Sequence, residues 1–105
     1  MTGDFGLTDV QAAVRRTFAD LADREAAPAA AERDALCEFP RDLFRRVGDL
    51  GFFGMRYPEA AGGSDADAVS FCLAAEEIAR GWTSLAASSL MQALMGTFFV
   101  WRSGN

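Results

Sequence analysis

The stretch that decides the fold is FPRDLFRRVGDLGFFG, residues 39–54. Pro40 has a fixed φ that suits a first helical turn and no amide hydrogen that would be left unpaired there, so a helix is predicted to begin at this point. Gly51 can adopt a left-handed conformation and is predicted to end the helix. Between them, apolar side chains recur at the spacing of one helical face; they are Leu43, Phe44, Val47 and Leu50. The stretch therefore predicts one amphipathic helix with a defined beginning and end.

The next segment is predicted to be irregular before a further helix begins. Tyr57 precedes Pro58, and a residue before proline avoids the α region. Ser64, with Asp67 three residues later, is expected to cap a helix that runs from about residue 66 to residue 80. Its apolar side chains fall on neighbouring faces, so burial is expected over more than one narrow stripe. These side chains are Val69, Cys72 and Leu73 on one face, and Phe71, Ala75 and Ile78 on the other.

The segment from residue 81 to residue 101 has no charged side chain and is long enough that a membrane-spanning helix has to be weighed. Polar side chains interrupt it repeatedly, whereas a stable single span is usually dominated by large aliphatic residues. We therefore expect no membrane and instead a central helix that its neighbours bury.

Upstream of the opening stretch, Thr8 and Gln11 have the spacing of a capping box and predict a helix start. One apolar stripe follows it, made of Val10, Val14, Phe18 and Leu21. Pro28 is expected to kink or restart the helix, because its ring crowds the preceding turn. The alanine-rich residues 29–35 favour helix again, so a bent helix or two short helices are expected. Together the segments predict an all-α domain, a helical bundle of roughly four to six helices.

Composition narrows the function further. A chain of 105 residues is long enough for one domain, and its net charge of −5 would repel a nucleic acid backbone. It has no histidine, which excludes Ser-His-Asp and Cys-His catalysis and histidine-ligated zinc. Cys37 and Cys72 lack metal-ligand spacing, so no metal site is expected. Two cysteines allow at most one disulfide, which is not the framework of a secreted protein, so a reducing, cytoplasmic setting is expected. Asp4 lies where a signal peptide would be basic, so no export is expected.

Three stretches in order resemble the N-terminal helical domain of the acyl-CoA dehydrogenase family. They are residues 7–11 with Ala27-Pro28, residues 39–63 and residues 75–104. The middle stretch is the most specific, with its helix, its turn and its closing Pro58-Glu59 and Gly62-Gly63 pairs. The resemblance covers residues 1–105 and implies the first of three domains. The β domain and the C-terminal helical bundle are absent from this chain, which we therefore expect to be a fragment or a truncated chain.

The same resemblance implies an FAD-dependent oxidoreductase of fatty acid metabolism that removes two hydrogens across the α and β carbons of an acyl thioester such as an acyl-CoA. In the family, a glutamate of the C-terminal bundle takes the α proton and the flavin accepts hydride from the β carbon. FAD is held mainly by the absent domains, so this chain alone is expected to be inactive, and its own cofactor-binding residues remain unknown. The complete enzyme is expected to be a homotetramer that uses an electron-transfer acceptor.

No catalytic residue is expected within the chain. Adjacent Glu76 and Glu77 resemble a candidate base, but a glutamate near Arg80 is more often an ion-pair partner, and the family places its base elsewhere.

The family match assigns a substrate-binding role to the long uncharged segment. Position by position, it places Ala87, Ser88, Met91 and Met95 against the acyl tail, and positions 87, 91 and 95 are four apart, as on one helix face. Methionine adapts well to an aliphatic chain. The alternative is that these four residues only pack against other helices. Where relatives often have His-Asn, this sequence has the segment 92–95, Gln-Ala-Leu-Met, which leaves the acyl preference open.

Two other functions remain open on the sequence. The chain could be the first domain of a related acyl-CoA oxidase or flavin monooxygenase, which the missing catalytic glutamate and flavin pocket would distinguish. It could also be a short, non-catalytic partner subunit that docks on a full-length dehydrogenase. The open reading frame separates truncation from the partner interpretation.

Overall fold

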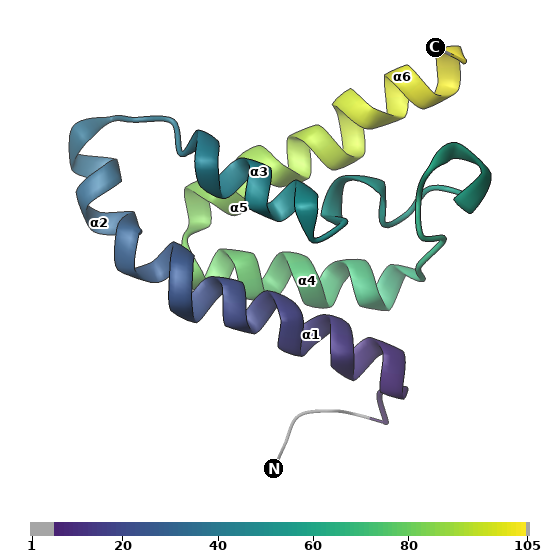
Figure 1. Ribbon diagram of the computed structural model, residues 1–105, viewed down its shortest axis with the longest axis horizontal. Coiled ribbons are helices and arrows are strands. Elements are labelled where there is room, and N and C mark those ends of the chain that lie inside the picture. The colour runs from purple at the N-terminus through teal and green to yellow at the C-terminus, as the bar shows by residue number, and fades with distance from the viewer. Residues whose placement is uncertain (1–5, 105) are drawn as a thin grey trace.

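Helices make up most of the computed structural model, which describes residues 6–104 (Figure 1). The principal extents are 40 × 39 × 16 Å and the radius of gyration is 14.0 Å, compared with about 13 Å for a compact chain of this size. The helices therefore form a thin slab. The all-α prediction is confirmed, and residues 6–104 contain no strand. Asp4, which argued against a signal peptide, lies outside the described residues.

Within the described residues the helices form four continuous rods, two of which contain a π-helical segment. The first rod is α1 (Asp9–Leu21), π segment Ala22–Ala26 and α2 (Ala27–Leu36); the second and third are α3 (Arg41–Asp49) and α4 (Ala68–Gly81); the fourth is α5 (Thr83–Met91), π segment Gln92–Gly96 and α6 (Thr97–Ser103). Short 3₁₀ turns at Phe52–Gly54 and Glu59–Ala61 lie between α3 and α4.

The first rod begins as predicted. The Thr8 hydroxyl accepts a hydrogen bond from the Gln11 amide at 3.1 Å, and the Gln11 side chain accepts one from the Thr8 amide at 3.0 Å. Of the predicted stripe, Phe18 and Leu21 are buried. The prediction was wrong for Val10, which is exposed because it lies at the open end of α1.

Pro28 neither stops nor restarts this rod, which stays helical from Asp9 to Leu36. The widened π turn lies directly before Pro28, and its closing bond runs from the Ala27 amide to the Ala22 carbonyl. A π turn leaves a carbonyl without an α-helical donor, which suits a proline that has no amide hydrogen to offer. Of the two expected alternatives, the structure has the bent helix, since the rod stays continuous but changes direction between α1 and α2 (Figure 1).

The helix α4 differs from its prediction at the cap and on one face. Asp67, not Ser64, caps it, because the Asp67 carboxylate accepts from the Ser70 amide at 2.7 Å. The Ser64 hydroxyl instead donates to the Met55 carbonyl at 3.4 Å. The apolar face made of Val69, Cys72 and Leu73 was predicted to be buried, but Val69 and Cys72 are exposed, because no described element packs there.

The core forms where α1 and α4 lie side by side beneath α3 (Figure 1). Phe52 stacks on Phe71 with ring centroids 4.8 Å apart and meets Phe18 edge-on at 5.8 Å. The helix α4 approaches the first rod closely at Gly81, where a Cβ would lie 2.8 Å from the Cβ of Ala22. The side chain of Trp82 then donates to the Asp34 carboxylate at 3.0 Å.

The fourth rod is not the buried central helix that the sequence predicted. Its first half meets the core through Leu85, Ala86, Ser89 and Ala93, but α6 projects beyond the other rods (Figure 1). By length and composition alone, Thr83–Ser103 could cross a membrane, and 22% of its apolar window is buried. The prediction was wrong for α6, because no other described helix packs along it and only the loop around Tyr57 contacts it.

Candidate acyl-binding face

The four predicted substrate-binding residues lie on the fourth rod, outside the hydrophobic core. Ala87 is exposed and Ser88 is half-buried, both on α5. Met91, at the end of α5, is 59% exposed, and Met95, in the π segment, is 46% exposed. The structure thus brings the four residues together on one rod, with three of them open to whatever lies beside it. Contact with an acyl tail stays a prediction.

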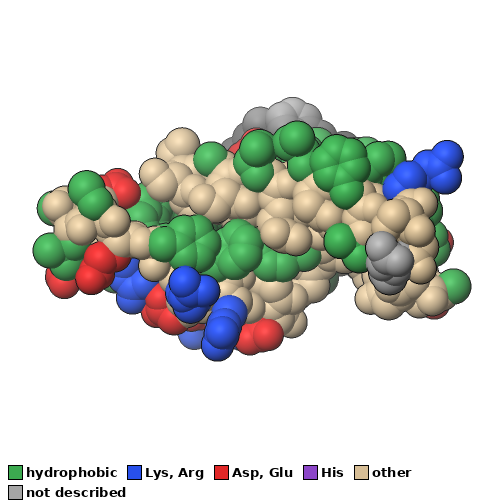
Figure 2. All heavy atoms as spheres, turned by 90° about the horizontal axis from the view of Figure 1, so that it is seen from above, with side chains coloured by type: hydrophobic (Ala, Val, Ile, Leu, Met, Phe, Trp, Pro, Cys, Tyr) green, Lys and Arg blue, Asp and Glu red, His purple; other side chains and the backbone are tan. Residues whose placement is uncertain are grey.

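Large apolar side chains continue along the rod beyond these residues. Figure 2 looks down on the face that carries α3 and α6, where hydrophobic side chains gather in bands and charged groups lie around their edges. The exposed large side chains of the rod are Met91, Leu94, Met95, Phe98, Phe99, Val100 and Trp101. An exposed apolar surface of this extent is typical of a binding or interdomain surface.

A tyrosine from the loop between α3 and α4 contacts the fourth rod at its π segment. The Tyr57 hydroxyl donates to the Ala93 carbonyl at 2.7 Å, although the two residues are 36 positions apart. Its ring also packs against Trp101, with centroids 5.5 Å apart. Burial raises the pKa of Tyr57 above its usual value, so the phenol keeps its proton and stays a donor at neutral pH.

The loop that carries Tyr57 depends on two glycines. Gly62 has a φ of +91°, in the left-handed region that favours glycine. A Cβ on Gly63 would overlap the carbonyl oxygens of Tyr57 and Gly54, so only glycine allows these loop segments to approach so closely. Between this loop and α6 lies a cavity of about 360 Å³, lined by Tyr57 and Trp101 among others.

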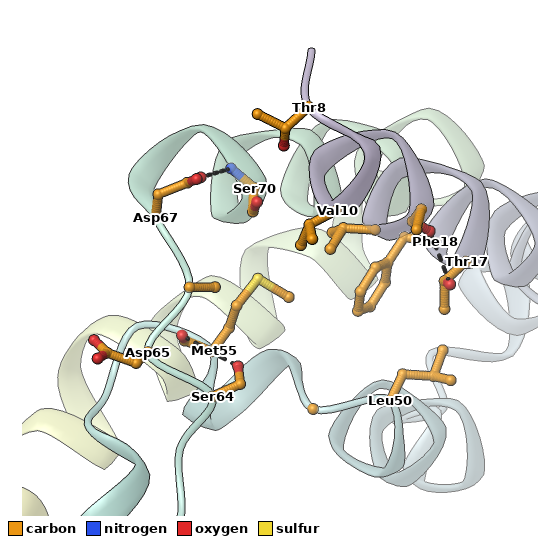
Figure 3. Close-up of a pocket in the computed structure, with 14 residues that line it drawn as sticks. Thr8, Val10, Thr17, Phe18, Leu50, Met55, Ser64, Asp65, Asp67 and Ser70 are labelled. Carbon is orange, nitrogen blue, oxygen red and sulfur yellow. Dashed lines mark hydrogen bonds between the residues drawn. The ribbon is translucent and has the colours of Figure 1, made fainter.

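A larger groove of about 800 Å³ lies on the other side of the molecule's core, between α1 and the start of α4 (Figure 3). Val10, Phe18 and Met55 line its apolar part, and the carboxylates of Asp65 and Asp67 stand at its rim. Hydrogen bonds from Ser70 and Gln11 hold the pKa of Asp67 below its usual value, so this rim stays negative.

The groove between α1 and α4 does not fit the pyrophosphate of a flavin. The pyrophosphate of FAD is anionic and is normally met by backbone amides at a helix N-terminus or by cationic side chains. The groove in Figure 3 instead presents carboxylates, and the N-terminal amide that α4 offers there is occupied by Asp67. No step of a flavin reaction is therefore assigned to residues of this chain.

The paired glutamates of α4 have structural partners. The Glu77 carboxylate accepts from Arg80 at 2.8 Å, and Arg80 also reaches Asp23 on the first rod at 2.8 Å. Glu77 is buried and its carboxylate pairs with Arg80. Arg80 thus joins two rods, and Glu76 remains exposed.

Sequence reasoning missed Tyr57 as a site residue. The Tyr57-Pro58 pair was interpreted only through its backbone, whereas its side chain reaches the rod that carries the predicted acyl-binding residues. The one signal available in the sequence is that this is the only tyrosine of the chain.

Comparison with known proteins places this geometry in a family. Residues 8–105 match the family model described as "Acyl-CoA dehydrogenase, N-terminal domain". The chain is 54% identical over 102 residues to benzylmalonyl-CoA dehydrogenase of Aromatoleum aromaticum, which covers 97% of this chain and 27% of that protein. It is 34% identical over 95 residues to the 3-(aryl)acrylate reductase of Clostridium sporogenes, and this match covers 89% of the chain and 25% of that protein.

The fold has a counterpart among solved structures. Butyryl-CoA dehydrogenase of Megasphaera elsdenii aligns with a TM-score of 0.85 and 28% identity, over 94% of this chain and 27% of that one. The chain thus spans about a quarter of the length of these relatives.

Proposed function

Because the chain belongs to the acyl-CoA dehydrogenase family, we propose that it is the N-terminal domain of a flavin-dependent enzyme that dehydrogenates an acyl-CoA between its α and β carbons. The single observation that carries this proposal is the family match over residues 8–105, which coincides with the whole described fold. The bound flavin would supply the electron sink. The catalytic base and most flavin contacts would lie outside this chain.

The part we assign to this chain is to hold the acyl group. Ala87 and Ser88 are small, and Met91 and Met95 have flexible side chains that adapt to an apolar ligand. Their exposure leaves them available to a ligand bound between this domain and the rest of the protein. The rod would therefore form one wall of the acyl pocket and exclude water from it.

We further propose that the acyl group carries an aryl ring. Support comes from the names of two relatives, benzylmalonyl-CoA dehydrogenase and 3-(aryl)acrylate reductase. The small side chains of Ala87 and Ser88 leave room for a ring beside the methionines. We also propose that the complete enzyme is a cytoplasmic homotetramer that passes electrons to a flavoprotein acceptor. The two free cysteines agree with a reducing compartment.

The proposal is tested on the full-length protein encoded by the reading frame that contains this sequence. Purified protein is mixed anaerobically with straight-chain and aryl-bearing acyl-CoAs, and bleaching of the flavin absorbance is followed. Rapid bleaching by at least one acyl-CoA, fastest with an aryl-bearing one, is expected. A protein that carries flavin but is bleached by none of them would contradict the dehydrogenase assignment. A reading frame that stops after Asn105 would favour the non-catalytic partner instead.

A further inference from the structure

The π segment Gln92–Gly96 changes how the backbone of the fourth rod is bonded. Its closing bond runs from the Thr97 amide to the Gln92 carbonyl, five residues back. In an α-helix, that amide would bond to the Ala93 carbonyl, four residues back. The π turn therefore takes the α-helical donor away from Ala93, and a carbonyl deprived of its donor needs another partner.

The Tyr57 hydroxyl supplies that partner at 2.7 Å. In a partly buried position, this hydrogen bond favours the π turn over the regular helix, since the α form would give the carbonyl back to Thr97. Tyr57 and the π turn are thus linked through one oxygen atom.

Tyr57 is itself held firmly. Its amide donates to the Gly54 carbonyl at 3.0 Å, and its carbonyl accepts from the Asp65 amide at 2.9 Å. Gly63 passes against this backbone where no side chain would fit, and Trp101 packs on the ring. The hydroxyl is therefore presented to Ala93 from a fixed loop.

The π turn changes which way Met95 points relative to Met91. In an α-helix, residues four apart are about 40° past one full turn. A π turn holds more than four residues, so residues four apart fall short of a full turn. The π turn thus turns Met95 back toward the line of Ala87 and Met91, instead of letting it drift around the rod.

We propose that Tyr57 is a positioning residue for acyl selectivity: by binding the Ala93 carbonyl it holds the π turn that aligns Met95 with Ala87 and Met91. The inference rests on the proposed function, since it requires this face to contact the acyl group. Tyr57 itself acts through the helix and not by touching the substrate.

The test uses the full-length flavoprotein with Tyr57→Phe, which keeps the ring against Trp101 and removes only the hydroxyl. The matched control is Thr17→Val, which removes a hydroxyl that donates to a helix carbonyl, Ala13, on α1. Two properties are determined: kcat/KM across a ladder of acyl-CoAs of increasing length and bulk, and the carbonyl that the Thr97 amide bonds to in a crystal structure of the variant.

For Tyr57→Phe we expect the Thr97 amide to bond to the Ala93 carbonyl instead of the Gln92 carbonyl, and a relative change of roughly threefold or more in kcat/KM between small and bulky acyl groups, carried mainly by KM. Thr17→Val should change neither property. An unchanged ladder overturns the positioning role, whether or not the acceptor of the Thr97 amide changes. An unchanged acceptor also overturns it, because the π turn would then not depend on the hydroxyl. A wild-type protein that oxidises no acyl-CoA would instead contradict the proposed function, and only that outcome does so.

Discussion

Glu77 shows how a single residue's surroundings decide its role. It is buried beneath the first rod and hydrogen-bonded to Arg80, whose other partner is Asp23. Its carboxylate is already engaged by the Arg80 guanidinium at 2.8 Å. Its position fits a structural link between rods.

We predict that Glu76→Gln and Glu77→Gln in the full-length enzyme leave proton abstraction largely intact. Loss of a positioned general base typically costs ~10²–10⁴-fold in rate, so the two interpretations separate clearly. The rate of flavin bleaching by substrate is the measurement. Glu77→Gln should also lower stability by on the order of 1 kcal/mol through its ion pair, while the exposed Glu76→Gln serves as its control. A rate loss of the size given above, in a folded protein, would assign the base to this chain.

Met91 is the residue with which we test the acyl-binding face. Because it is 59% exposed, Met91→Phe adds bulk outside the core and should change the melting temperature little. If an acyl tail lies there, the full-length enzyme should shift its kcat/KM profile toward shorter or smaller acyl groups by at least several-fold, since one methylene in an apolar pocket is worth about 1–3 kcal/mol. An unchanged profile with a clearly lower melting temperature would mean that Met91 packs against protein.

At the scale of elements, the packing of α4 on the first rod depends on Gly81. Its Cα faces Ala22 so closely that a Cβ would lie 2.8 Å from the Ala22 Cβ and 2.9 Å from its Cα. Backbone atoms cannot move aside as the end of a flexible side chain can. The separation of the two rods is therefore set by the absence of one methyl group.

We predict that Gly81→Ala lowers the free energy of unfolding of the chain by about 1–3 kcal/mol, the usual cost of overpacking, despite alanine's higher helix propensity. Denaturant unfolding followed by circular dichroism measures it. Gly54→Ala is the matched control, since the nearest atom to its added Cβ would be 3.5 Å away. If both variants were equally stable, the close approach of the rods would not be the constraint we describe.

At the scale of the whole molecule, the chain is a slab 16 Å thick with an uncovered apolar rod along one side. A slab so thin encloses few side chains completely, and the fourth rod contributes large apolar groups that the other rods do not cover. This shape agrees with a domain whose function depends on further parts of a protein.

We therefore predict that the chain alone does not bind FAD tightly. Its net charge of −5 and the carboxylates at the rim of the groove between α1 and α4 oppose an anionic pyrophosphate. Titration with FAD, followed by flavin fluorescence and absorbance, should show no stoichiometric binding at micromolar concentrations, whereas the full-length protein under the same conditions should retain its flavin. Saturable one-to-one binding by the chain would place the flavin site within these residues.

The sequence by itself determined the start of α1 and both ends of α3. The Thr8–Gln11 capping box, the start at Pro40 and the stop at Gly51 all appear in the structure, because each depends on bonds within a few residues of backbone. The face that carries Ala87, Ser88, Met91 and Met95 came from the family resemblance, and helical spacing alone was enough to keep it on one rod.

Only the tertiary structure decided which surfaces are covered and how the fourth rod is bonded. Val10 and Val69 are apolar yet exposed, while Glu77 is charged yet buried, because burial depends on which other rod packs there and not on the side chain alone. The π turn likewise depends on the Tyr57 hydroxyl, which reaches the Ala93 carbonyl from 36 residues away. The helical pattern of the sequence does not predict that contact, because the pattern describes neighbours along one helix. The contact forms only when the Tyr57 loop folds against the fourth rod.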